Sequence, residues 1–487
     1  MCQVDEEYNG QLEHRVTPRG CFKEYFIHKF RAMLGKNRVI FPGEKVLLAV
    51  SGGPASSSML SQVQEGLSRD APKKLRFVPG IIYIDEGGAS GQSMEERKRA
   101  LAELESVFRA TNYHYHIVHL DLPSSVLEAG SSATEKPQTG SSYKAAVDHF
   151  IQTRKNQNQH PDLSVENVQS LRMQEVQSGG TSPITPEHTQ ALQRLFASVR
   201  TLTAKEDLLH TLRQHLILHT ARTQGYTKVM MGDSCSRLAI KLLSNISLGR
   251  GASLATDTGF SDPRYGDVVI VRPMRDYSSK EIAYYNRMFD IPSVFIPGLD
   301  CKAQDKASIQ RLTESFVTKL QADFPSTVST IYRTSEKLNT ACPPQNTNTQ
   351  LSAKCLLCVC ALDTKLEEFS AYQATLISEQ LSQRRGPRPG FTPGTAAAPG
   401  SPPASSAGQG QSQGCETGEG GCCPSPETVD LKSLLCYSCG LTIKDMTTRD
   451  ALPQYILSEA ERRRSQMREI SEFLLEDEAI PRVNGSL

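Results

Sequence analysis

The sequence predicts an α/β protein built on a doubly wound parallel sheet. Short apolar runs alternate with segments of helical periodicity, and the first of these runs ends in a glycine-rich turn. Strands that alternate with helices usually pair in parallel, with helices covering both faces of the sheet. A chain of 487 residues is long enough to bury a sizeable core. The expected strands are 46–50, 77–85, 114–120, 228–232 and 267–271.

Capping residues and apolar spacing predict the helices. In a capping box, a hydroxyl and a carboxylate three residues apart satisfy backbone N–H groups at the start of a helix. Three pairs have this spacing: Ser93 with Glu96, Thr203 with Glu206, and Ser278 with Glu281. One further helix is predicted from an apolar stripe at intervals of three and four residues, namely Ile309, Leu312, Phe316 and Leu320.

The first predicted strand passes through Ser51, Gly52 and Gly53 into a helical segment. A glycine turn at a helix start directs backbone N–H groups toward an anion, and the helix dipole favours negative charge there. Ser56 and the two serines after it offer further hydroxyl donors. We expect a phosphate-binding loop, although the same turn can also serve packing alone.

Two aspartates follow predicted strands. Asp85 ends the second strand, and Asp233 follows the fourth. Nucleotides bind at the carboxyl ends of strands near the switch point of a doubly wound sheet. Asp85 is therefore expected to meet a ribose hydroxyl or a metal-bound water, unless it lies in a solvated turn. Asp233 faces the same edge or caps the next helix.

Two Cys-x-x-Cys pairs are the strongest metal signal in the chain. Cys355 with Cys358 and Cys436 with Cys439 would supply four thiolates, as in a structural zinc site. The long segment between the pairs adds little to the cost of closure, because that cost rises only with the logarithm of length. Cys360 is a spare thiol in the same turn, which leaves an iron–sulfur cluster open.

Histidines form two further groups without nearby cysteine or acidic ligands at metal spacing. One group lies on the third predicted strand, and His215 with His219 lies on a helix. We interpret both as core or surface histidines rather than ligands.

Composition limits the class of protein. A net charge of +1 excludes a globally basic nucleic-acid binder, so any RNA contact must rest on a local patch. No apolar run approaches the ~20 residues of a membrane helix. The first residues lack the features of a signal peptide. A cytosolic location is therefore expected, where 13 cysteines indicate metal ligation or reactive thiols more than disulfides.

The expected organisation has three parts. An N-terminal segment covers 1–35, an α/β domain covers 36–336, and a cysteine-rich region covers 337–487. Segments 123–186 and 384–426 are rich in small and polar residues, and we predict that they are disordered insertions.

The glycine turn resembles the loop of the PP-loop ATP pyrophosphatases, whose pattern is Ser-Gly-Gly-x-Asp-Ser. Ser51, Gly52, Gly53 and Ser56 match this pattern, whereas Ala55 stands where it has an aspartate. Segments 28–38, 199–206, 232–235 and 271–276, with both cysteine pairs, make the chain similar to the cytoplasmic tRNA 2-thiolation proteins, and most of all to the partner subunit of their thiolase.

That resemblance implies a PP-loop fold and a role in 2-thiolation of the wobble uridine of tRNAs for Lys, Glu and Gln. In this family ATP activates the uracil oxygen, and a thiocarboxylated ubiquitin-related modifier supplies sulfur. The implied partners are the catalytic thiolase subunit and tRNA, and ATP with magnesium is a possible ligand. Candidate tRNA contacts, each equally compatible with a solvated charge, are Lys36, Arg38, Arg200, Lys205, Arg250 and Arg272.

The chain departs from the catalytic pattern in several places. Ala55 replaces the aspartate, and no cysteine lies in 198–210 or 271–276, where the active subunit is expected to carry thiols. The N-terminal cysteine module of relatives is reduced to Cys21. We therefore expect a non-catalytic or weakly catalytic partner subunit. The alternatives are a competent sulfurtransferase that uses Cys235 or Cys301, and a zinc-stabilised scaffold without nucleotide.

Overall fold

The computed structural model describes residues 18–68, 71, 74–121, 185–299, 301, 303–338, 354–362 and 431–477. The chain divides into two compact units, of which Met1–Thr364 with Leu434–Leu487 forms the first and Lys365–Ser433 the second. Apart from Lys432 and Ser433, the helices and strands given below belong to the first unit. The predicted disordered insertions lie outside the described residues, apart from positions 185 and 186.

A six-stranded sheet forms the centre of this unit. Its strands are β1 (Lys45–Ala49), β2 (Val78–Asp85), β3 (His114–His119), β4 (Lys228–Met231), β5 (Ser261–Tyr265) and β6 (Val268–Val271). The order is β3-β2-β1-β4-β6-β5, and every pairing is parallel except that of β5 with β6. The predicted doubly wound parallel sheet is confirmed. Its switch point lies between β1 and β4, because the chain winds outward from β1 and then returns to its other side.

The sequence does not predict β5, which pairs antiparallel at the edge of the sheet. Pro263 stands in the middle of this strand. Proline cannot donate to a strand ladder, so it is confined to edge strands and bulges. The register of β5 against β6 shifts between Asp262 and Tyr265, as expected for an irregular edge.

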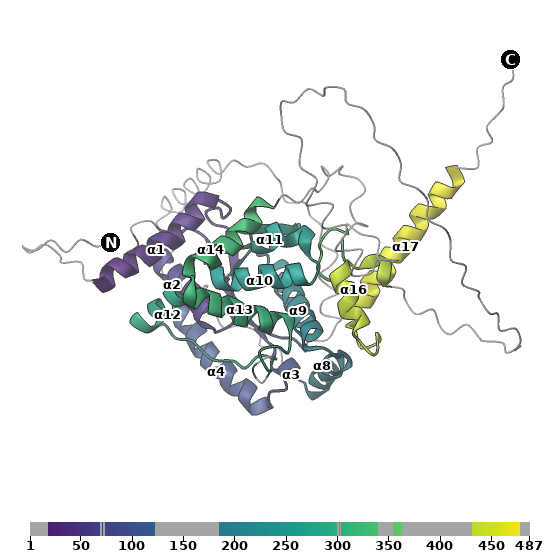
Figure 1. Cartoon of the computed structure of the whole chain (residues 1–487), viewed down its shortest axis with the longest axis horizontal. Helices are drawn as coiled ribbons and strands as arrows, with labels where there is room; N and C mark the ends of the chain where they lie inside the picture. Colours follow the sequence, from purple (N-terminus) through teal and green to yellow (C-terminus); the bar gives the residue numbers. More distant parts are fainter. Residues whose placement is uncertain are drawn as a thin grey trace, which may run out of the picture. The chain divides into compact units, whose positions relative to one another are not determined.

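Helices pack around the sheet (Figure 1). Their bounds are α1 (Pro18–Asn37), α2 (Pro54–Leu67), α3 (Gly87–Ser90), α4 (Met94–Thr111), α8 (Pro186–Ser198), α9 (Leu202–Thr223), α10 (Cys235–Ser247), α11 (Leu254–Thr258), α12 (Ser279–Met288), α13 (Ile309–Asp323), α14 (Pro325–Thr334), α16 (Tyr437–Lys444) and α17 (Gln454–Asp477). Short 3₁₀ turns are η1 (Gly251–Ser253), η2 (Ser335–Lys337) and η3 (Lys432–Leu434). Among the helices that the structure describes, none combines the length and apolar character needed to cross a bilayer.

Two apolar clusters hold these helices in place. The larger joins one face of the sheet to α1, α2, α4 and α12. Within it, Phe26 of α1 stacks on Tyr285 of α12 with ring centroids 3.9 Å apart. The smaller joins α10 to α13 and α14, which lie side by side in Figure 1. On the sheet, α9 contacts β2, β4 and β6.

The capping predictions are correct at two of three positions. Ser93 and Ser278 form complete capping boxes at the starts of α4 and α12. The third prediction is wrong, because Thr201 caps α9. Thr203 lies inside that helix, where its hydroxyl accepts a hydrogen bond from the backbone of Ile309.

Helix α13 forms as predicted, but its apolar stripe is not its buried face. Leu312 and Phe316 are 52% and 54% exposed, whereas Thr313 and Val317 are buried. Apolar periodicity therefore located the helix without identifying the side that packs on α10.

Candidate functional site at the carboxyl edge and the four-cysteine centre

The predicted phosphate loop forms a tight turn between β1 and α2. Gly52 has a φ of 81°, in the left-handed region that favours glycine. A Cβ on Gly52 would lie 2.9 Å from Leu104 Cδ2, and its carbonyl accepts a 2.9 Å hydrogen bond from Val294 N–H. The turn is thus covered by another segment of the same chain.

Serine hydroxyls beside this turn form hydrogen bonds within the fold. Ser56 donates to the carbonyl of Gly53 at 3.0 Å, and Ser57 donates to that of Gly52 at 3.3 Å. Ser58 donates to the side chain of Asn286. Because these protons stabilise the turn itself, the hydroxyls contribute to its shape rather than donate outward to a phosphate.

Alanine substitutions at Gly52 and Gly53 are expected to have different effects on folding stability. Gly52→Ala should cost about 2 kcal/mol, because a left-handed conformation penalises any Cβ and Leu104 must also move. Gly53 has an ordinary φ of −72°, and its nearest non-neighbouring atom would be 3.6 Å from a Cβ. Gly53→Ala should therefore leave stability unchanged or slightly raised. Urea unfolding of both variants measures this difference, and equal losses would contradict the assignment.

Asp85 is buried in an ionic network and does not face a ligand, so the predicted ribose or water contact is wrong. Its carboxylate accepts hydrogen bonds from Arg97 at 2.7 Å, from His119 at 2.8 Å and from the backbone of Gly87 at 3.0 Å. Burial alone would raise the pKa of Asp85, but the hydrogen bonds from His119 and Arg97 outweigh it and lower this pKa. Asp121 is the second carboxylate on Arg97.

Asp233 lies at the carboxyl edge, where it pairs with Arg272 at 3.3 Å. It does not cap α10, because Ser234 accepts the capping hydrogen bond from Arg237 N–H. Arg272 is 1% exposed and donates to the carbonyls of Thr256 and Gly259. Since its guanidinium fastens the loop before β5, Arg272 is not available as a tRNA contact.

Arg250 is also an internal residue. It forms a two-point ion pair with Asp207 of α9, at 2.7 and 2.8 Å, and only 10% of its side chain is exposed. Two of the six predicted tRNA contacts, Arg250 and Arg272, are thus corrected to structural residues. Lys36, Arg38 and Arg200 are exposed and Lys205 is half-buried, so these four remain at the surface.

Positive charge gathers at the same edge from residues that sequence reasoning missed. Arg213 of α9 pairs with Glu86 at 2.8 Å. Burial and the nearby charge of Arg272 lower the pKa of Lys241. The signal in the sequence was weak, because both lie within helices whose apolar residues dominate the pattern.

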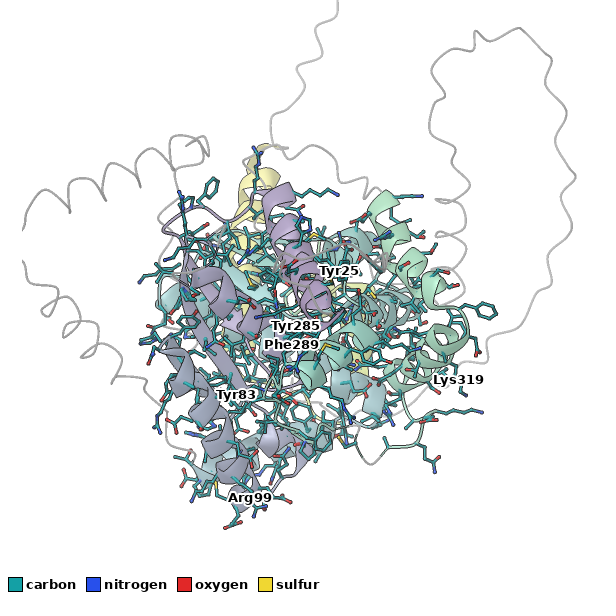
Figure 2. All side chains as sticks on the ribbon, turned by 90° about the vertical axis from the view of Figure 1, so that its left-hand side faces the viewer. Tyr25, Tyr83, Arg99, Tyr285, Phe289 and Lys319 are labelled. Carbon is teal, nitrogen blue, oxygen red and sulfur yellow. The ribbon has the colours of Figure 1, made fainter. Side chains whose placement is uncertain are left out.

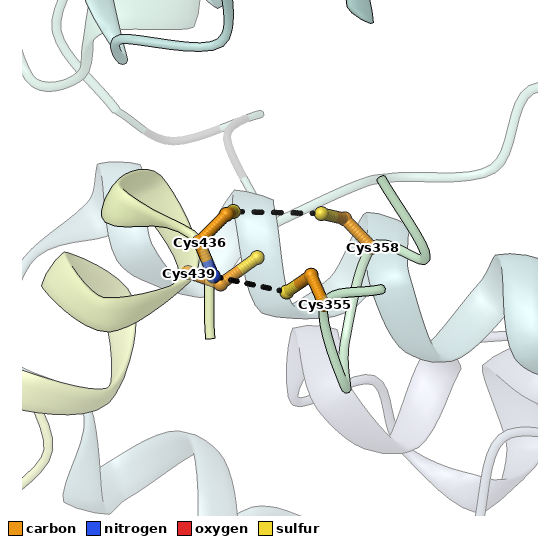
Figure 3. A group of neighbouring side chains, drawn as sticks. All are labelled: Cys355, Cys358, Cys436 and Cys439. Carbon is orange, nitrogen blue, oxygen red and sulfur yellow. Dashed lines mark hydrogen bonds between the residues drawn. The ribbon is translucent and has the colours of Figure 1, made fainter. Parts of the chain in front are cut away.

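The two Cys-x-x-Cys pairs come together as predicted (Figure 3). All four sulfurs lie within 4.8 Å of one another, and those of Cys358 and Cys436 are 3.5 Å apart. Four thiolates at 2.3 Å from a tetrahedral zinc would be separated by about 3.8 Å. The donor set and spacing therefore suit a metal ion that these cysteines would enclose completely.

A local backbone motif holds each of the two cysteine pairs. The first pair sits in a turn closed by the Lys354–Ala361 bridge, and Val359 within it has a φ of 59°. The second pair opens α16, with Cys436 as its N-cap residue. The amide of Cys436 donates to Cys355 Sγ at 3.3 Å. A helix N-terminus favours negative charge, so it stabilises thiolates at this position.

Hydrogen bonds and an ion pair connect the four-cysteine centre to α9. Arg250, already paired with Asp207, lies 3.8 Å from Cys439 Sγ, and Thr442 of α16 donates to the same carboxylate at 2.8 Å. His215 hydrogen-bonds through one ring nitrogen to the carbonyl of Leu357 and through the other to Tyr455, both at 2.7 Å. His215 thus supports the first cysteine turn and is not a ligand, in agreement with its interpretation from the sequence.

The remaining described cysteines lie outside the tetrad. Cys360 Sγ accepts a hydrogen bond from Arg264 at 2.9 Å, so it is engaged by an arginine. Cys235 is 5% exposed, and burial raises the pKa of its thiol. Both properties make Cys235 a poor nucleophile. Cys301 is exposed, and Cys21 lies in α1.

A parallel sheet with this order and a glycine turn at its switch point define a doubly wound α/β protein, here extended by a cluster of four cysteines that could hold a metal ion. A family model described as cytoplasmic tRNA 2-thiolation protein 2 matches residues 308–441. The chain is 58% identical over 518 residues to the zebrafish (Danio rerio) protein of that name, covering 98% of this chain and 100% of the relative. The human protein of that name is 50% identical over 527 residues, with 98% of each covered.

The chain therefore belongs to the cytoplasmic tRNA 2-thiolation protein 2 family. Among solved structures it is similar to the U34-tRNA thiolase NcsA from Methanococcus maripaludis, solved with its [4Fe-4S] cluster. That similarity has a TM-score of 0.41 and 13% identity, and it covers 67% of this chain and 82% of the other.

Proposed function

We propose that this chain is the non-catalytic subunit of a cytoplasmic heterodimer that 2-thiolates the wobble uridine of tRNAs for Lys, Glu and Gln. The sulfur would come from a thiocarboxylated ubiquitin-related modifier, and the other subunit would perform the chemistry. The observation that carries this assignment is the state of the carboxyl edge. The turn keeps its glycines, but the hydroxyls of Ser56 and Ser57 donate to its own carbonyls. Ala55 replaces the carboxylate, and Asp85 is committed to Arg97.

Thiol chemistry at this edge has equally little support. Sulfur relay needs an accessible thiolate, whereas Cys235 at the start of α10 is buried and its thiol pKa is raised. Cys301 is exposed, and its sulfur accepts a hydrogen bond from the backbone of Gly298 at 3.1 Å. Because the other subunit is proposed to perform the chemistry, Cys301→Ser should leave thiolation by the heterodimer unchanged, and a large loss would favour a competent sulfurtransferase instead.

We further propose that the four-cysteine centre holds a structural zinc ion. Four thiolates leave no coordination position for a substrate, which is typical of structural rather than catalytic zinc. The third cysteine of the first turn, Cys360, accepts a hydrogen bond from Arg264 and stands outside the tetrad. When bound, zinc would link 354–362 to α16 and so stabilise the surface formed with α9. Elemental analysis of the purified heterodimer distinguishes zinc from iron.

Restoring the missing carboxylate is expected to have no catalytic effect. Ala55→Asp should not give the isolated chain ATP-dependent sulfur transfer to tRNA, because a carboxylate alone supplies neither an accessible thiol nor free hydroxyl donors. Single-turnover thiolation of tRNA by the purified variant measures this, with the heterodimer as the positive control. Detectable 2-thiouridine from the variant alone would contradict the non-catalytic assignment.

A further inference from the structure

A second polar site lies away from both the cysteine centre and the glycine turn. It is a cavity of about 330 Å³ where the C-terminal end of α1 meets the loop after β6 and the end of α14. The polar residues lining it are Lys36, Asn37, Arg275, Asp276, Arg333 and Glu336. Three cations from three separate segments thus line one small volume, together with two carboxylates.

Arg275 is the central residue of this cavity. Its side chain is only 8% exposed, and its one ion pair among the described residues is with Glu336. Its Nε and Nη2 atoms are buried without a hydrogen-bond partner in the part of the chain that the structure describes. A buried donor left without an acceptor costs about 1–3 kcal/mol. The guanidinium also lies 5.4 Å from the ring centroid of Tyr332, which orients it. The site is therefore short of an acceptor.

The neighbouring charges indicate what the acceptor is. Asp276 already accepts a hydrogen bond from the Tyr332 hydroxyl. Glu336 is 47% exposed, so another anion can take its place as the ion-pair partner of Arg275. Lys36 is exposed, and Arg333, whose side chain is 60% exposed, lies 3.9 Å from Asp276 in a long ion pair. The C-terminal end of α1 disfavours an anion by about 0.3–1 kcal/mol. One charge-assisted hydrogen bond, worth about 1.5–3 kcal/mol, outweighs that penalty.

The surface leading to the cavity is suited to a polyanion. Helix α1 carries five lysines and arginines against one glutamate. Two of those cations are paired, Lys23 with Glu65 and Lys29 with Glu281. Arg31 and Lys36 lie further along the helix toward the cavity. A ligand with repeated negative charge gains from this arrangement, because each phosphate neutralised by a cation releases counterions.

We propose that the cavity formed by Lys36, Arg275 and Arg333 binds a backbone phosphate of the tRNA. This inference rests on the proposed function for the identity of the RNA, but the phosphate chemistry stands on the cavity alone. A free phosphate or mononucleotide has the same chemistry, so the test must distinguish these sources.

The first arm measures tRNA binding by the heterodimer across a salt series. Lys36→Glu with Arg333→Glu should weaken affinity at least ~10-fold and reduce the salt slope by about one unit for the lost contact. The matched control is Arg99→Glu with Lys319→Glu, which changes charge equally on α4 and α13. Figure 2 shows both control residues well away from Tyr25 of α1, and both are exposed. Equal weakening by the control pair would overturn the proposal.

A second pair of variants avoids damage to the fold. A Cβ at Gly35 meets nothing within 4 Å, so Gly35→Asp places a negative charge beside Lys36 without a clash. Gly35→Ala is its neutral control and should bind tRNA as the wild type does. Gly35→Asp should weaken binding several-fold, and identical affinities for the two variants would contradict the site.

The last arm uses inorganic phosphate on the full chain, compared with chloride at equal ionic strength. Phosphate should raise the thermal midpoint of the wild type but not of Lys36→Glu with Arg333→Glu. If phosphate protection is lost in the variant while tRNA affinity is kept, the cavity binds a free phosphate and the RNA assignment is wrong. No protection in the wild type and unchanged tRNA affinity would reject the cavity altogether. A heterodimer that binds no tRNA would contradict the proposed function, while the phosphate arm would still decide the cavity.

Discussion

Cys436→Ser is expected to release the metal from the four-cysteine centre and to loosen α16. Structural zinc supplies about 10–16 kcal/mol of apparent binding energy in small zinc domains, so loss of one of four thiolates removes a large part of the local stability. The effect should come from the lost thiolate itself, because serine keeps the backbone amide that donates to Cys355 and removes only the sulfur that lies 3.5 Å from Cys358 Sγ. Zinc per heterodimer, measured by elemental analysis with the partner's own metal subtracted, should fall by one.

Two controls accompany that measurement. Cys301→Ser changes an exposed cysteine outside the tetrad and should leave metal content unchanged. Deletion of most of 384–426 should also preserve it, because closure of the loop between the pairs depends only weakly on length. Metal content that Cys436→Ser does not alter would show that the four cysteines share no ion.

Arg97→Met is expected to cost about 3–5 kcal/mol of folding stability, since it leaves buried carboxylates without their cation. Asp85 and Asp121 are 3% and 6% exposed, and Arg97 is the arginine that contacts both. The network also reaches α8, because Thr189 donates to Asp121. The matched control is Arg109→Met on the same helix. Its ion pair with Glu105 has the arginine 67% exposed, so the loss should be under about 1 kcal/mol.

The pH dependence of unfolding adds a signature that packing alone would not give. The pKa of Asp85 is lower in the folded state than its ordinary value of about 3.9. Its contribution to stability is therefore present above that value and is lost as pH falls through the folded pKa. Chemical unfolding from about pH 6 down to about pH 2 should show this acid sensitivity weakened in Arg97→Met. Equal losses for Arg97→Met and Arg109→Met would contradict the assignment of this network.

Local signals in the sequence predicted most of the architecture. Five of the six strands were expected, because β-branched and apolar runs bounded by turns are visible without tertiary information. The capping boxes at Ser93 and Ser278 and the grouping of the cysteine pairs are likewise encoded by short spacings. Strand β5 was not predicted, because the proline at position 263 in its middle is unusual in a strand and occurs only at sheet edges and bulges.

The polar interior could not be predicted in the same way. Asp85 meets His119 34 positions away, and Asp207 meets Arg250 43 positions away. Nothing local distinguishes such partners from solvated charges, so Asp85 was expected at a ligand and Arg250 at tRNA. Both errors have one cause, which is that charged side chains near a predicted site were assumed to face outward.

Mass spectrometry of tRNA from cells that lack this chain tests the central claim most directly. Cells without it should lose 2-thiouridine at the wobble position of tRNAs for Lys, Glu and Gln, because the catalytic subunit would have no partner. Re-expression of the wild type should restore the modification. Wobble 2-thiouridine at normal levels in cells without the chain would contradict the account.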